Sequence, residues 1–399
     1  MSVGTPFHSR TAPLNRKMQW REWSGYFASS VYADHHDIEY NAIREAAGLI
    51  DLSPLYKYRV SGPDAERLVD RVITRDATKL AVGAVYYTPW CDESGKVVDD
   101  GTVHRLGEQE FRWTAADPQY RWLTLNATGL DVTVEDESER VGALALQGPF
   151  SREILEMATG ESFADLRYFR RRASKIGKAA VDVSRTGYTG DLGYEIWCEA
   201  DAAVGVWDRL MEVGKARAIR PAGMLALDVV RLEAGLILLE VDYTSARHAV
   251  IPDQAYSPYE IGLGRLVDLG KPGDFVGKRA LRAEAARGGP ERRLVGLELE
   301  WAGIEALYAA QNLPPSAPAA VSRATVPCFD ATGGRQIGRV TSCGWSPILK
   351  TAIALASVPA SYEPVGTRVA VEWTVEGRRG RVPARVVSLP FLDLPRRRA

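Results

Sequence analysis

The sequence is poor in the residues that build metal centres and disulfides. Of its 399 residues, four are cysteine and five are histidine. The chain has no CxxC pair and no histidines at the spacing of an HExxH helix, so we expect no metal cofactor. Widely scattered cysteines in a chain of this length are typical of reduced, buried thiols and favour a cytoplasmic protein. They are Cys91, Cys198, Cys328 and Cys343.

Long apolar runs and an excess of charge of one sign are also missing. No stretch approaches the roughly 18 apolar residues that a membrane-spanning helix needs, and the first residues lack the apolar core of a signal peptide. Lys and Arg number 50 against 51 for Asp and Glu, whereas nucleic-acid-binding proteins carry a basic excess. We therefore expect neither a membrane nor a nucleic acid as a partner. The basic run at residues 395–398 predicts a solvated tail.

The length and the pattern of apolar residues predict several domains. A chain of this length typically folds as two or three. Helix-like and strand-like segments alternate over residues 58–149 and again over 148–271, which is typical of α+β domains. From residue 275 onward, short strand-like segments are separated by Gly and Pro, a pattern that favours a β-barrel or sandwich.

Two adjacent carboxylates, Asp99 and Asp100, lie inside the strand-like run 97–106. Asp is disfavoured in strand interiors, so the pair is unusual. In a regular strand neighbouring side chains point to opposite faces, so one carboxylate faces a cleft, and Asp100, Thr102 and His104 share a face. A β-turn that uses both Asp residues explains the segment equally well.

Two further segments suggest ligand contacts. Glycines in the run 186–193 allow the backbone to approach a ligand closely, although a tight hairpin ending in the strand of Glu195 is the simpler interpretation. No GK[ST] follows, so the run is not a P-loop. In the apolar helix predicted at 221–236, the fork of Arg231 suits a ligand carboxylate. An intrahelical pair with Asp228 explains Arg231 equally well.

Taken together and in this order, these segments resemble the folate-binding aminomethyltransferase family, typified by the glycine-cleavage T-protein. The resemblance extends from about residue 18 to 387. The matching segments are Val98-Asp99-Asp100, Leu146-Gln147-Gly148-Pro149, Thr186-Gly187-Tyr188-Thr189-Gly190 with Tyr194-Glu195-Ile196, Arg231-Leu232-Glu233-Ala234-Gly235, Phe275-Val276-Gly277-Lys278, Ile337-Gly338 with Thr341-Ser342 and Ser346-Pro347, and Ile353-Ala354-Leu355-Ala356.

The resemblance implies an α+β fold of three domains in a ring, with tetrahydrofolate in the central channel. Residues 1–57 and 150–274 would form one discontinuous folate-binding domain with a ferredoxin-like sheet plus helices. Residues 58–149 would form a second α+β domain with a sheet and helices of the same kind, and this domain carries the Asp100 strand. Residues 275–399 would form a C-terminal β-barrel domain.

The resemblance also implies roles for single residues. Asp100 would be the catalytic carboxylate near N5 of the pterin, where it would stabilise a cationic one-carbon centre or relay a proton. Glu195 would pair with the amino-pyrimidine edge, whose two N–H donors suit a carboxylate. His104 would be a surface residue or, as a weaker alternative, an assisting relay. Tyr86 and Tyr188 would contact the pterin ring. Arg231 would hold the glutamyl tail.

Departures from the family pattern concentrate on the donor side. Ala115 stands where the family has Asn, and Leu225 and Leu227 replace Gly and Arg. Residues 53–58 replace a Ser-His-Met-type segment, and the stretch 236–256 is longer than usual. We therefore expect a remodelled pocket for the one-carbon donor. Its candidate residues are Tyr56, Tyr243, Arg247 and His248.

The sequence thus predicts a tetrahydrofolate-dependent one-carbon transferase or demethylase. It would move a methyl or methylene group from an N-, O- or S-linked small-molecule donor to tetrahydrofolate. One alternative is the glycine-cleavage T-protein itself, with an aminomethyl-lipoyl carrier protein as partner. The other is a folate-binding protein without transferase chemistry, like the family's iron–sulphur-assembly relatives, which carry a Cys that the turn at 187–191 lacks.

Overall fold

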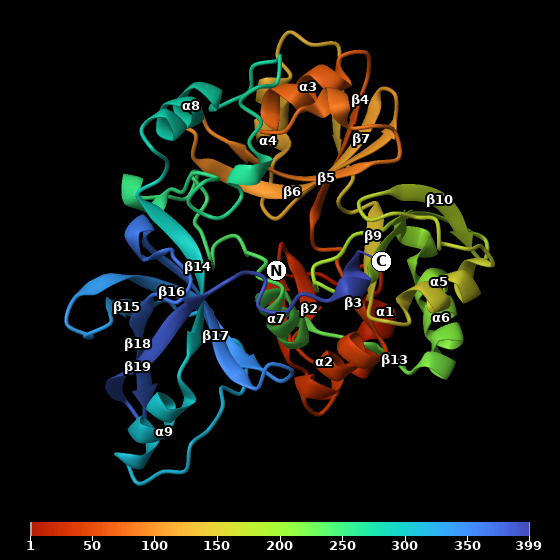
Figure 1. The fold of residues 1–399 in the computed structure, drawn as a ribbon. Coiled ribbons are helices and arrows are strands. Elements are labelled where there is room, and N and C mark those ends of the chain that lie inside the picture. The colour runs from red at the N-terminus through yellow and green to blue at the C-terminus, as the bar shows by residue number, and fades with distance from the viewer. Residues whose placement is uncertain (1, 399) are drawn as a thin grey trace.

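The computed structural model describes residues 2–398, which form three large sheets and a small hairpin (Figure 1). The first sheet has six strands in the order β10-β11-β12-β9-β3-β13. Neighbouring strands run antiparallel, except that β13 pairs with β3 in parallel. The strands are β3 (Ala47–Asp51), β9 (Val141–Gln147), β10 (Arg171–Ile176), β11 (Ala179–Ser184), β12 (Gly193–Glu199) and β13 (Ile219–Pro221).

Elements packed against both faces of this first sheet explain why β9 is buried along its whole length. One apolar cluster joins Leu144 and Leu146 to α5 (Ser151–Thr159) and α6 (Ala203–Gly214). A second cluster lies around Ala143 and Ala145, the residues of opposite parity. It includes side chains of α2 (His36–Glu45) and α7 (Met224–Glu233). The short helix α1 (His8–Thr11) and the hairpin of β1 (Trp20–Trp23) and β2 (Tyr26–Ser29) precede this unit.

The second sheet has five strands in the order β5-β6-β7-β4-β8, and every pairing is antiparallel. Along the chain, α3 (Ala65–Val72) follows β4 and α4 (Tyr120–Asn126) follows β7. This is the βαββαβ succession of a ferredoxin-like sheet with β5 added at one edge. The strands are β4 (Tyr56–Ser61), β5 (Val85–Cys91), β6 (Val97–Gly107), β7 (Glu110–Ala115) and β8 (Thr133–Asp136).

The third unit is a closed six-stranded barrel in the order β14-β17-β16-β15-β18-β19. The sequence predicted a barrel or a sandwich, and closure leaves no unpaired edge strand. Two helices were not predicted: α9 (Trp301–Ala309) packs against β18 and β19 of the barrel, whereas α8 (Lys278–Ala286) lies beside the second unit, where Leu281 shares an apolar cluster with Cys91 and Val97 (Figure 1). The strands are β14 (Arg292–Leu299), β15 (Val326–Asp330), β16 (Gln336–Ser346), β17 (Thr351–Pro359), β18 (Arg368–Val375) and β19 (Arg378–Val387).

Several local expectations change in the structure. Residues 141–147, placed with the second unit from the sequence, form β9 of the first sheet, because their two apolar faces are covered there. Asp99 and Asp100 lie within β6, so the β-turn interpretation was wrong.

The four cysteines are unpaired and buried, as predicted. Among residues 2–398, no helix has the length and apolar character needed to cross a bilayer.

The C-terminal basic run was predicted to be a solvated tail, but in the structure it packs onto the first unit. Arg396 donates to Asp191 through Nε at 2.6 Å and Nη2 at 2.9 Å. The Asp191 carboxylate is completely buried and also pairs with Arg44 at 3.2 Å. Because a buried charge needs a partner, this bidentate contact draws the last residues onto the first unit.

That contact gives a prediction for Arg396→Ala. The variant leaves Asp191 with fewer donors, so we expect the free energy of unfolding to fall by about 1–3 kcal/mol. Urea denaturation checks this, with Arg398→Ala as the control, since Arg398 is exposed and pairs with the half-exposed Asp393 at 3.4 Å. Equal stability of the two variants would contradict the structural role of Arg396.

Candidate active site

The two adjacent carboxylates of β6 point to opposite faces, as the alternation predicted. Asp99 is fully buried, and its oxygens accept hydrogen bonds from the backbone N–H of Asp100 at 2.7 Å, Ala116 at 3.1 Å and Asp117 at 3.0 Å. Burial raises the pKa of Asp99, and the adjacent charge of Asp100 adds to this rise. Asp99 thus fixes the start of the 116–119 segment, whereas Asp100 is half-buried and faces the first unit.

Asp100 is held by two phenols. Tyr87 Oη donates to Oδ2 at 2.6 Å, and Tyr243 Oη donates to Oδ1. Burial raises the pKa of Asp100, while the hydrogen bonds from Tyr243 and Tyr87 lower it. Each carboxylate oxygen has two lone pairs, so the group can still accept a further donor.

The face of β6 that carries Asp100 packs against the face of β12 that carries Glu195. His104 lies four residues after Asp100, and its ring meets the ring of Trp197 edge-on, with centroids 5.6 Å apart. Trp197 lies two residues after Glu195 and therefore on the same face of β12. Arg112, opposite His104 in the sheet, reaches across to Asp182 at 3.0 Å. The strands that carry Asp100 and Glu195 are therefore packed against each other.

The Glu195 carboxylate lies at the start of β12, 8% exposed. Thr186 Oγ1 donates to its Oε2 at 2.6 Å, and Ser184 lies within hydrogen-bonding distance of Thr186 at 2.7 Å. Burial raises the pKa of Glu195, and the hydroxyl donors of Thr186 and Ser184 oppose the rise. A group with only acceptor atoms at such a site suits a ligand edge that carries N–H donors.

The glycines near Glu195 make room for a side chain of the protein. A Cβ on Gly187 would lie 2.1 Å from Gln147 Oε1, and a Cβ on Gly193 would lie 2.3 Å from Gln147 Cδ. Gln147 in turn accepts from Thr189 Oγ1 at 2.8 Å and donates to the carbonyl of Thr186 at 3.2 Å. The connection between β11 and β12 is thus an eight-residue loop ordered by Gln147, longer than the tight hairpin that its pattern suggested.

His104 is fully buried, so the expected surface position was wrong. Its Nε2 lies 3.0 Å from Thr102 Oγ1, which lies 2.7 Å from Thr114 Oγ1. Burial lowers the pKa of His104, and the positive charges of Arg112 and Arg171 lower it further. The packing of two sheets encloses the ring, and single-strand alternation does not reveal that contact.

Of the three remaining residues of the implied folate site, Tyr188 and Arg231 lie close enough for their charges to interact, whereas Tyr86 lies elsewhere. Tyr188 donates through Oη to the carbonyl of Ile237 and lies close enough to Asp100 for their charges to interact. Tyr86 is on the opposite face of the second sheet, under the guanidinium of Arg75 at 3.4 Å from the ring centroid. Arg231 is 0% exposed. The ring and tail contacts of these residues stay predictions.

Arg231 is committed to partners within the chain. Its Nη1 donates to Asp242 at 2.8 Å, its Nη2 donates to Ser342 Oγ at 2.8 Å, and its Nε lies 3.7 Å from Asp228. The pair with Asp228, held open from the sequence, is therefore present, alongside the stronger bond to Asp242. A contact with a ligand tail would require these bonds to exchange.

Of the four candidate donor-pocket residues, only Tyr243 touches Asp100. Arg247 is exposed and donates to the carbonyl of Pro118 at 3.2 Å. His248 is exposed beside Glu240 and Asp117, with ligand-type atoms of the three within 4.8 Å of one another. Tyr56 is half-buried on β4; burial raises its pKa, and the charge of Asp117 adds to this rise.

Sequence reasoning missed Tyr87 and Asp242. Tyr87 lies opposite Thr102 in the β5–β6 register, so it shares the face of Asp100, whereas Tyr86 lies opposite Val103 on the core face. Strand parity relative to Asp100 could therefore have selected Tyr87. Asp242 carried no sequence signal, because its partners come from distant elements.

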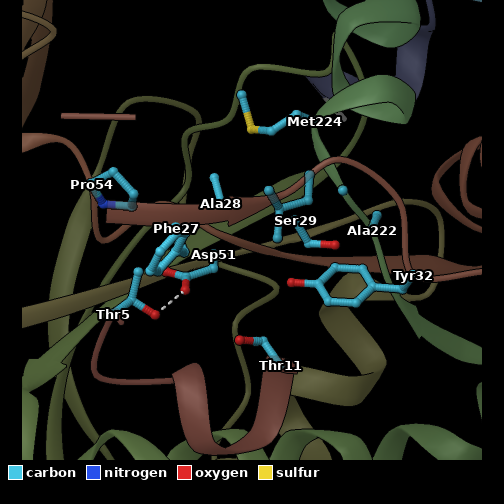
Figure 2. A pocket seen from close by; sticks show the side chains of 12 residues that line it. Thr5, Thr11, Phe27, Ala28, Ser29, Tyr32, Asp51, Pro54, Ala222 and Met224 are labelled. Atoms are coloured by element: carbon cyan, nitrogen blue, oxygen red, sulfur yellow. Dashed lines mark hydrogen bonds between the residues drawn. The ribbon is translucent and has the colours of Figure 1, made fainter. Parts of the chain in front are cut away.

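Two hollows in the molecule lie elsewhere. A cavity of about 10 Å³, room for about one water molecule, is lined in part by residues of β2. Figure 2 shows its lining side chains, among which Thr5 Oγ1 donates to Asp51 at 2.6 Å. Burial raises the pKa of Asp51. A wider groove of about 460 Å³ runs beside β14 and β17. None of the predicted site residues lines either hollow.

Comparison with known proteins identifies the family. The GCVT N-terminal domain model matches residues 7–271, and the model of the glycine cleavage T-protein C-terminal barrel domain matches residues 292–393. The chain belongs to the glycine cleavage T-protein family. This confirms the family prediction; folate-dependent one-carbon transfer with tetrahydrofolate as the acceptor is the chemistry of this family.

Relatives of this T-protein-family chain are named as enzymes. It is 38% identical to the trimethylamine-oxide aldolase of Ruegeria pomeroyi over 98% of this chain, and it spans 47% of that protein. It is 38% identical to an aminomethyltransferase of Symbiobacterium thermophilum over 90% of both chains. The glycine cleavage system aminomethyltransferase T of Bartonella henselae superposes with a TM-score of 0.82 at 26% identity, covering 98% of this chain and 99% of that one. The predicted α+β fold with a C-terminal barrel is therefore confirmed.

Proposed function

We propose that this chain transfers a methyl or methylene group from an N-, O- or S-linked donor to tetrahydrofolate. The observation that supports the proposal is the contact between two strands that each carry a hydrogen-bonded carboxylate. Asp100 is held by two phenols on β6, and Glu195 is held by Thr186 on β12. The His104–Trp197 contact fixes the two strands against each other.

The side chains at this place fit tetrahydrofolate, the proposed acceptor of the one-carbon group. Glu195, nearly buried and without donor atoms when ionised, would take the N–H groups of the amino-pyrimidine edge. When bound, tetrahydrofolate supplies a nucleophilic nitrogen for the one-carbon unit. Asp100 would lie beside that nitrogen, where its ionised form stabilises positive charge as the one-carbon group moves. A carboxylate held by neutral phenols keeps the charge needed for this role.

Among donors, we propose an N-methylated amine first. The trimethylamine-oxide aldolase relative carries a methylated nitrogen compound in its name. In this chain the long segment 236–256 brings Tyr243 to Asp100. A phenol at this place adds a polar wall without adding a charge, which suits a small amine. We propose a small-molecule donor as the partner.

The rival is an aminomethyltransferase that takes its group from a lipoyl carrier protein. It is supported by the Symbiobacterium thermophilum relative, which matches over 90% of both chains. The two proposals differ in the size of the donor. A carrier protein would need a surface on this chain, whereas a free amine would not.

A donor screen with tetrahydrofolate tests the proposal. Donors labelled with ¹³C on the transferred carbon would be methylated amines, methoxy-aromatics, methylsulphonio compounds and an aminomethyl-lipoyl carrier protein, and NMR would follow the label. We expect label to pass from an amine to tetrahydrofolate. Transfer only from the carrier protein would support the rival, and tetrahydrofolate binding without transfer from any donor would indicate a binding protein.

A further inference from the structure

Tyr243 gives the Asp100 carboxylate a second phenol from an element outside the sheet. Tyr87 on β5 donates to Oδ2 at 2.6 Å, and Tyr243 in segment 236–256 donates to Oδ1. Tyr243 is 2% exposed. The orientation of Asp100 therefore depends on two elements that the chain brings together from positions 156 residues apart.

Segment 236–256 is fixed along the strand that carries Asp100. Ser245 Oγ donates to the carbonyl of Val98 at 2.6 Å, and the N–H of Ala246 donates to the carbonyl of Val97 at 2.8 Å. The N–H of Val97 donates back to the carbonyl of Tyr256 at 2.7 Å. The contacts of Ser245 and Ala246 lie two and three residues after Tyr243 and restrict the backbone that carries its ring.

The neighbouring residue, Asp242, anchors the segment to the rest of the molecule. It is completely buried, and its Oδ2 accepts from Arg231 Nη1 at 2.8 Å and the N–H of Leu238 at 2.9 Å. Its Oδ1 accepts from Thr341 Oγ1 and Ser342 Oγ, both at 2.7 Å. Arg231 belongs to α7, and both hydroxyls belong to β16 of the barrel. Four donors thus fix the backbone beside Tyr243.

We propose that Tyr243 is a positioning residue for Asp100, held in place through Asp242 by α7 and the barrel. Its phenol orients the carboxylate from one side while Tyr87 holds it from the other. This inference rests on the proposed function, in which Asp100 is the catalytic carboxylate. It assigns to the long segment a role in the reaction itself and not only in lining the donor pocket.

The charges around Asp100 set the sign of the expected pH effect. Burial raises the pKa of Asp100, and the bonds from Tyr243 and Tyr87 lower it. Asp99 on the same strand and Tyr188 on the β11–β12 loop also face it electrostatically. Removing the Tyr243 hydroxyl takes away one donor to the charged form, so the pKa of Asp100 rises. As the pH is lowered, the Asp100 carboxylate of the variant is therefore protonated at a higher pH than that of the wild-type protein.

Tyr243→Phe tests the inference, with Tyr256→Phe as the matched control. Tyr256 lies in the same segment, and its hydroxyl accepts from Arg339, away from Asp100. The ¹³C signal of the Asp100 carboxyl, assigned by its loss in Asp100→Asn, would be titrated in the unliganded full chain. We expect the midpoint to rise by about one to two pH units in Tyr243→Phe and to stay unchanged in Tyr256→Phe. In turnover, we expect kcat to fall about tenfold and its acid limb to move up in pH, with the KM for tetrahydrofolate unchanged.

The outcomes separate this inference from the proposed function. The inference would be overturned if Tyr243→Phe titrated like the wild-type protein and kept its pH profile. Equal shifts in Tyr243→Phe and Tyr256→Phe would also overturn it. A shifted titration in a protein that transfers no one-carbon group from any donor would uphold the role of Tyr243 and reject the proposed function instead.

Discussion

Asp100→Asn is expected to lower kcat by about 10²- to 10⁴-fold while tetrahydrofolate affinity stays within threefold of wild type. The substitution keeps the size and an acceptor oxygen for one phenol, but it removes the negative charge beside the transferred carbon. Asp100 is half-buried, and among residues 2–398 its side chain is hydrogen-bonded to Tyr87 and Tyr243, so we expect the variant to fold. Steady-state kinetics with the donor found in the screen would measure the loss.

Glu110→Gln is the control for Asp100→Asn. Glu110 lies at the start of β7, beside the strand of Asp100, and pairs with Arg59 at 2.6 Å with its side chain 45% exposed. A partly exposed ion pair of this kind contributes little to the free energy of unfolding, so the variant should fold and its turnover should be unchanged. Undiminished turnover in Asp100→Asn would remove Asp100 from catalysis.

Arg231→Leu is expected to lower the free energy of unfolding by about 3–5 kcal/mol. Arg231 and Asp242 are both completely buried, and the substitution leaves the carboxylate without its cation. Arg323→Leu is the matched control, because Arg323 is partly exposed and shares Asp228 with Arg21. We expect that control to cost about 1 kcal/mol or less. Urea denaturation measures both variants.

The same variants separate two roles for Arg231. If Arg231 bound the glutamyl tail, Arg231→Leu would weaken tetrahydrofolate binding with little change in stability. The bonds to Asp242 and Ser342 instead predict a loss of stability first. A stable Arg231→Leu protein with weakened binding would contradict the structural assignment and support the tail contact.

Strand alternation carried the sequence prediction for Asp100 because it depends only on neighbouring residues. The opposite directions of Asp99 and Asp100 follow from the pleat alone. The same rule places Tyr87, opposite Thr102, on the Asp100 face and Tyr86, opposite Val103, on the core face. A resemblance to a motif did not make that distinction, whereas the register of the two strands does.

Contacts between units were beyond local reasoning. The pair of Arg231 with Asp242 needs a turn after α7, and the hydroxyls that complete it come from β16, more than 90 residues later. The burial of His104 needs the contact with Trp197 on another sheet. In each case a charged or polar side chain has a partner that only the tertiary fold supplies, so its local pattern predicted a surface or a ligand.

Titration of tetrahydrofolate into the wild-type protein and Glu195→Gln tests the central claim most directly, with Glu199→Gln as control. Glu199 lies on the same face of β12 but is exposed at its end. The account predicts that wild type and Glu199→Gln bind equally and that Glu195→Gln binds about 10- to 100-fold more weakly, since a carboxylate that accepts N–H donors is lost. Absence of binding to the wild-type protein, or equal affinity in all three, would contradict it.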